Sequence, residues 1–135
     1  MDFEIVGEGQ YHTVITTIVT TVVIEAGDVC ELASGLPVKG TATGAKLAYA
    51  PMASPNGDTQ IELTVGNDFL LKGTGEVVFA VDQKGDECDL VVDTAVQLID
   101  NDTLSTGVFT IDFSENAGVA GSAEEIRVRI LKPLY

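Results

Sequence analysis

Basic residues are scarce in this chain and tryptophan is absent: 7 Lys and Arg stand against 21 Asp and Glu in 135 residues. The formal net charge of −14 repels phosphate backbones and anionic lipids, so we expect neither nucleic acid nor a membrane as a partner. No apolar run reaches the ~18 residues that a membrane-spanning helix needs. With 2 Cys, the chain cannot build a framework of several disulfides.

Signatures of common enzymes are also missing. The sequence has no G-x-S-x-G, no phosphate-binding loop, no dinucleotide fingerprint and no Cys/His spacing suited to zinc. The single histidine, His12, lies in the apolar and Thr-rich run HTVITTIVTTVVI, where we expect a core or edge residue rather than a member of a catalytic triad. We therefore predict no catalytic, cofactor-binding or metal-binding residues.

No secretory signal is visible at the amino terminus. Met1 is followed by Asp2 and Glu4, without the basic and apolar regions of a leader. This start predicts synthesis in the cytoplasm.

What the chain does contain favours β-structure. Its apolar residues are mainly Val, Ile, Leu and Ala, with many Thr among them, and 14 Gly and 4 Pro punctuate the sequence. Segments 59–65 and 124–130 alternate apolar and polar residues, as half-buried strands do. We predict an all-β chain that folds as a small β-sandwich or β-barrel-like domain.

A repeated hexapeptide indicates internal duplication. GDVCEL at 27–32 returns as GDECDL at 85–90, and a Thr-Gly pair, an apolar segment, a turn cluster and an alternating strand follow each copy in the same order. The second copy carries about five extra residues around Val92 to Asp102. The two repeats cover about 17–72 and 73–131, within a β domain of residues 17–135. The alternative is that two similar hairpins arose from a shared composition.

Cys30 and Cys88 occupy equivalent places in the two repeats. Acidic residues flank both of them, which raises the pKa of a thiol and weakens it as a nucleophile. We predict two free, buried thiols that behave as small apolar residues.

The amino-terminal run TVITTIVTTVVI, residues 13–24, is almost entirely β-branched and predicts a long strand. A strand of this length left open would invite aggregation. Residues 1–16 therefore form either an edge strand of the domain or an arm that pairs with another chain.

Two acidic loops could be read as calcium sites. They contain Asp100-Asn101-Asp102 and Asp86-Glu87 with Asp89, but neither has EF-hand spacing or enough ligands for calcium on its own. We interpret both as solvated turns.

The stretches 27–65 and 107–130 together resemble head decoration, or capsid cement, proteins of tailed bacteriophages. The resemblance covers about half of the chain and consists of turn-and-strand patterns. It implies a non-catalytic protein on the outer surface of the virion head that clamps neighbouring major capsid subunits. It also implies a homotrimer at threefold positions and an amino-terminal segment that adds a strand to the capsid protein.

From that resemblance and from the edge and tail patterns, we expect a set of residues to contact the capsid or neighbouring subunits. The set comprises Tyr11, Val14, Ile15, Ile18, Val19, Arg127, Arg129, Leu134 and Tyr135. We expect Lys132 to Tyr135 to expose apolar groups after the last strand, with Pro133 preventing further pairing.

Two other function classes remain open at this point. One is a secreted or cell-surface β-sandwich module that binds a glycan or a protein, with or without calcium. The other is a small β-barrel enzyme whose site the sequence does not reveal.

Overall fold

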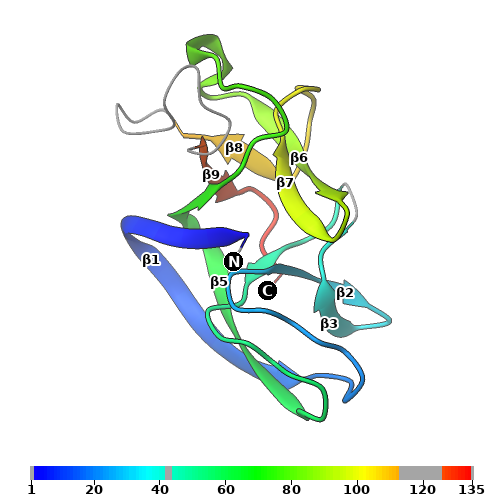
Figure 1. The fold of residues 1–135 in the computed structure, drawn as a ribbon. Helices are drawn as coiled ribbons and strands as arrows, with labels where there is room; N and C mark the ends of the chain where they lie inside the picture. Colours follow the sequence, from blue (N-terminus) through cyan, green and yellow to red (C-terminus); the bar gives the residue numbers. More distant parts are fainter. Residues whose placement is uncertain (1, 42–43, 113–125, 135) are drawn as a thin grey trace.

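The computed structural model describes residues 2–41, 44–112 and 126–134. They form an all-β domain in which a curled antiparallel sheet makes a half-barrel (Figure 1). The predicted fold class is therefore confirmed. The strands of the described residues are β1 (Phe3–Thr17), β2 (Val29–Ala33), β3 (Leu36–Lys39), β4 (Ala48–Tyr49), β5 (Gln60–Gly73), β6 (Glu87–Asp93), β7 (Val96–Asp100), β8 (Phe109–Ile111) and β9 (Ile126–Ile130), and one 3-10 turn, η1, spans Val81–Gln83.

The strand order is similar when read from its two ends. It runs β3-β2-β4-β5-β9-β8-β6-β7, with β1 on the free side of β5. From one end, the hairpin β3–β2 is followed by the short strand β4 and then by β5. From the other end, the hairpin β7–β6 is followed by the short strand β8 and then by β9, which pairs with β5 at the centre. The hairpins β2–β3 and β6–β7 turn at Ser34-Gly35 and Thr94-Ala95, all with positive φ, as two-residue turns between twisted strands require.

The two hexapeptides make the same backbone contacts. Gly27 and Gly85 both have positive φ, at 92° and 84°. The Gly27 N–H donates to the carbonyl of Ala50 at 2.8 Å, and the Gly85 N–H donates to the carbonyl of Ile111 at 2.9 Å. The repeated Gly-Asp thus marks the point where each copy turns into its first hairpin strand.

Strand β5 pairs with strands of both halves of the sheet. Its first half lies between β1 and β4, where Thr64 is opposite both Thr13 and Tyr49. Its second half lies beside β9, where Leu71 is opposite Val128. We define two units of the sheet. Unit one consists of β2, β3 and β4 together with the second half of β1 and the first half of β5. Unit two consists of β6, β7, β8 and β9 together with the second half of β5.

The amino-terminal strand is shifted from its predicted position. It covers Phe3–Thr17 and not 13–24, and the chain turns back after it through a hydrogen bond from the Val22 N–H to the carbonyl of Val19. After this turn, Ile18 and Ile24 are both buried in the same apolar cluster. At the other end, bulges let β1 continue through its glycines.

Two apolar clusters form the core. Gly66, with φ of 146°, lies where β5 passes from one cluster to the other. One cluster lies within the curl of the sheet and contains Phe3, Val29, Leu47, Tyr49, Phe69, Leu71, Phe79, Cys88, Leu90, Ile99, Val108, Phe109, Ile111, Ile126, Val128 and Ile130. The other contains Ile18, Ile24, Cys30, Ala48, Ala50, Ile61, Leu63, Val65 and Leu134.

A buried side-chain amide joins the ends of the sheet. Gln97 on β7 is 0% exposed, and its Oε1 accepts a hydrogen bond from the Val29 N–H on β2 at 2.8 Å. Its Nε2 donates to the carbonyls of Val29 and Gly40, both at 2.8 Å. In Figure 1 the β6–β7 hairpin accordingly reaches down toward β2. The Gln97 amide thus connects β7 to β2 through side-chain hydrogen bonds, in a place where the two strands form no backbone ladder.

An ion pair reinforces this closure at its rim. Lys39 on β3 lies 3.4 Å from both Asp2 and Asp28, and its Nζ donates to the carbonyl of Ala95 at 2.8 Å. Burial lowers the pKa of Lys39, but Asp28 and Asp2 outweigh it and the net shift is upward. Burial of Asp28 raises the pKa of its carboxyl despite the nearby lysine.

Both thiols are free and buried, as predicted. Cys30 and Cys88 are each 0% exposed, one in each apolar cluster. Burial is the main cause that raises the pKa of each to about 12, and nearby aspartates add to it. Neither thiol is available as a nucleophile near neutral pH.

Replacing the closing amide should destabilise the protein strongly. In Gln97→Leu the Val29 N–H and the Gly40 carbonyl lose their side-chain partner, while the Val29 carbonyl keeps its bond from the Gly40 N–H. Two orphaned buried groups should lower the free energy of unfolding by about 2 to 4 kcal/mol, measured by urea denaturation. Gln60→Leu, at an exposed position, serves as the control. Equal losses of unfolding free energy in Gln97→Leu and Gln60→Leu would contradict the closing role of Gln97.

The thiols should make stability fall in alkaline solution. An unfolded thiol ionises near pH 9.0 and the folded ones near 12, so the folded state holds more protons between these values. Stability is therefore lost as pH rises above 9, by about 1.4 kcal/mol per pH unit for each thiol. Cys30→Ala with Cys88→Ala should flatten this dependence in denaturation measured from pH 8 to about 10. Val108→Ala, which truncates a buried side chain and keeps both thiols, should retain the full slope.

Candidate functional site

The outer edge of β1 is the most conspicuous surface of the fold. Among the described residues, β1 pairs with β5 alone, so the edge facing away from β5 is open. Along it Tyr11, Thr13, Ile15 and Thr17 are exposed in alternation, with Ile15 at 67% and Tyr11 at 51%. Of the residues between them, Val14 packs against the second apolar cluster, Thr16 is partly buried and His12 is exposed.

The predicted contact residues fall into three groups. Tyr11, Ile15 and Val19 are exposed, while Val14, Arg127 and Arg129 are partly buried. Ile18 and Leu134 are 2% and 7% exposed and belong to the core. Tyr135 lies outside the described residues.

Ile18 and Leu134 therefore do not fit the contact role expected of them. The described part of the carboxy-terminal tail, residues 132–134, also differs from its prediction, because it docks on the domain and buries Leu134. The Leu47 N–H donates to the carbonyl of Lys132 at 2.8 Å, and the Leu134 N–H donates to the carbonyl of Leu47 at 3.0 Å. Pro133 lies between these bonds in a parallel bridge with Leu47, where it needs no N–H.

The two arginines lie on β9 within the sheet and are partly buried. Arg129 on β9 forms an ion pair with the buried Asp112 at 3.6 Å. Arg127 lies opposite Lys72 on β5, and its carbonyl accepts a hydrogen bond from the Asp112 N–H at 2.9 Å. Both arginines are thus linked to Asp112, Arg129 through its side chain and Arg127 through its backbone carbonyl.

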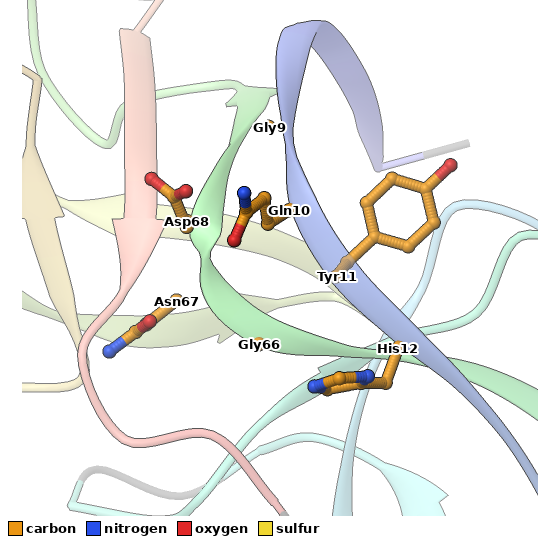
Figure 2. A pocket seen from close by; sticks show the side chains of 7 residues that line it. All are labelled: Gly9, Gln10, Tyr11, His12, Gly66, Asn67 and Asp68. Atoms are coloured by element: carbon orange, nitrogen blue, oxygen red, sulfur yellow. The ribbon is translucent and has the colours of Figure 1, made fainter.

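A pocket lies beside the open edge, where both strands bulge. It measures 590 Å³ and is lined by Gly9, Gln10, Tyr11, His12, Gly66, Asn67 and Asp68. Figure 2 shows Gln10 on the same side of β1 as Asp68, while the ring of Tyr11 points the other way. That ring lies edge-on to Phe69 with 5.7 Å between centroids.

The glycines make the pocket possible. A Cβ on Gly9 would collide with the carbonyl oxygen of Asp68 and lie 2.8 Å from Cα of Phe69. Gly66 combines a φ of 146° with close contact to the backbone of Gln10. The bulge side chains offer amide and carboxylate oxygens to a ligand, and His12 adds its imidazole. The sequence predicted His12 to be a core or edge residue, and the structure places it on the edge strand β1.

Sequence reasoning missed this pocket. The signal was present as Gly7 and Gly9 in one strand and Gly66-Asn67-Asp68 in another, since glycines inside strands often mark bulges. The sequence does not show that β1 pairs with β5, so it could not predict that the glycines of the two strands lie at the same place. Exposed Val23 was likewise not singled out.

The acidic loops do not converge on a cation site. No group of three or more His, Cys, Asp or Glu in the described residues is arranged to hold a metal. Asn101 is buried and uses its amide to bind the backbone of Val77 in both directions, each bond at 3.0 Å. The Asp100 carboxylate can accept a hydrogen bond from protonated Glu76, and this interaction is the main cause that raises the pKa of Glu76.

Crowding at Gly9 gives a direct test of the bulge. In Gly9→Ala the new methyl group must push the β5 backbone away, so we expect a loss of about 1 to 3 kcal/mol. Hydrogen exchange should become faster in β1 and β5. Gly35→Ala is the control, because it has open space and carries only the cost of its positive φ, with changes confined to the β2–β3 hairpin. Unchanged exchange at the β5 bulge would contradict the close approach.

Comparisons with known proteins gave no match. No family model matches it, and neither a curated protein nor a solved structure matches. Within the described part of the chain, no helix has the length and apolar character needed to cross a membrane.

Proposed function

We propose that the chain is a non-catalytic decoration protein that binds the outer surface of a tailed-phage head. In this role it stabilises the shell by clamping neighbouring major capsid subunits. The proposal rests on the resemblance in segments 27–65 and 107–130, and on one feature of the structure that suits it, the open edge of β1.

The β1 edge offers what strand addition requires. An incoming extended segment gains main-chain hydrogen bonds along the edge, and side-chain contacts add selectivity. Ile15 and Tyr11 provide apolar area there, and Val19 and Val23 continue it beyond the strand, all four being exposed. Such a surface gains affinity from area and repetition around a symmetric shell, without any tuned catalytic group.

Charge is compatible with an external position. The formal charge of −14 disfavours contact with packaged DNA, which lies on the inner side of the shell. The stretch from Gly9 to Ile24 contains no Asp, Glu, Lys or Arg, so the proposed contact avoids the repulsive part of the surface.

The bulge pocket favours a second candidate, a surface module that binds a glycan. Asn67, Asp68 and Gln10 present oxygens and amide hydrogens that suit sugar hydroxyls. Binding of simple sugars that is lost in Asp68→Ala, in a chain that does not bind heads, would favour this candidate.

Binding to heads tests the main proposal. Purified chain is added to heads that lack it, and the mixture is separated on a density gradient. We expect the chain to sediment with the heads in many copies per particle. Ile15→Lys places a charge on the open edge opposite Glu62 and should weaken binding at least tenfold.

The control is Val81→Lys, an equally exposed apolar residue in η1, which should bind within twofold of the natural chain. Failure of the natural chain to sediment with heads would overturn the proposal. Equal binding by the two lysine variants would remove β1 from the contact.

A further inference from the structure

The β1 edge differs from the other ends of the sheet. The outer side of β7 is capped, because the Ile99 N–H donates to the carbonyl of Thr74 at 2.8 Å and the Ile99 carbonyl accepts from the Glu76 N–H at 2.9 Å. Strand β3 has four residues and contains Pro37 and Lys39, which oppose further pairing. From Gln10 to Thr17, β1 has none of these protections.

The internal repeat indicates that a strand belongs on this edge. In unit two, Val128 of β9 lies between Ile111 of β8 and Leu71 of β5. In unit one, Thr64 of β5 lies between Tyr49 of β4 and Thr13 of β1. The second half of β1 therefore takes the place in unit one that the second half of β5 takes in unit two.

The equivalent edge in unit two is occupied. Residues 3–6 of β1 run antiparallel to the second half of β5, with Phe3 opposite Gly73 and Val6 opposite Leu70. Glu4 and Lys72 add an ion pair at 2.6 Å. No described strand covers the corresponding edge of unit one, so one strand position of the repeat is vacant.

The charge distribution favours a second copy of the chain as the partner of the β1 edge in the free protein. Two copies that each carry −14 repel one another over most of their surfaces. The run from Gly9 to Ile24 carries no charged residue, so two copies meet there with the least repulsion. Thr13, Ile15 and Thr17 also make the edge self-complementary, with β-branched side chains that suit cross-strand pairs.

We propose that in the free protein the β1 edge of unit one is covered by the same edge of a second copy. The two β1 strands pair antiparallel across a twofold axis, and the sheets of both copies become continuous. The exposed stripe of one copy then lies beside that of the other, which buries part of Ile15 and Tyr11. A further consequence rests on the proposed function: this pairing must open before β1 accepts a strand from the capsid.

Sedimentation equilibrium over a range of concentrations tests the pairing. We expect a reversible monomer–dimer equilibrium for the natural chain. Ile15→Lys should raise the dimer dissociation constant at least tenfold, because like charges would face each other near the axis, and Lys opposite Glu62 keeps the fold intact. Val81→Lys should change it less than twofold. A natural chain that is monomeric throughout, or trimeric, would overturn the proposal.

Spin labelling gives a second readout that does not depend on a destabilising charge. The native thiols are buried, so Thr13→Cys provides the one reactive cysteine on a described surface. Label on Thr13→Cys should show a short intermolecular distance, whereas label on Val81→Cys should show a long one. Equal distances would overturn the pairing. Head binding without a dimer would reject the dimer alone, and a dimer without head binding would reject the proposed function alone.

Discussion

The closed shape of this domain depends on one side chain. Gln97 is buried at the meeting point of β7 and β2, and its amide satisfies backbone groups that no strand reaches. A sheet of short strands curls because its strands twist, but curling alone leaves polar backbone at the two ends. By pairing with Val29 and Gly40, the amide lets those ends approach and enclose the larger apolar cluster. The ion pairs of Lys39 then cover the rim.

Much of the fold could be predicted from the sequence because its turns and strands have strong local patterns. The Gly-Asp turns, the two hairpins and the alternating strands at Ile61–Val65 and Ile126–Ile130 follow from local patterns, and the pairing order repeats as those patterns do. The β6–β7 hairpin, residues 87–100, is longer than the β2–β3 hairpin, residues 29–39. Burial of the two cysteines followed from the same alignment.

The features that were not foreseen depend on contacts distant in sequence. Strand β1 ends at Thr17 because Ile18 and Ile24 share a cluster, which a one-dimensional pattern of β-branched residues does not record. Leu134 is buried because the backbone of Leu47 offers a place to dock, and the pocket exists because two bulges coincide. The sequence pattern grouped Ile15 with Ile18, but the turn after β1 leaves Ile15 exposed and buries Ile18.

The sharing of β5 has a consequence for the integrity of the molecule. One strand supplies Leu63 and Val65 to one apolar cluster and Phe69 and Leu71 to the other, and β1 runs beside it along its whole length. Neither unit can be excised without taking half a strand from its neighbour. Two halves with a common pattern have therefore become one cooperative body, in which local opening at either cluster is transmitted along a single continuous segment of backbone.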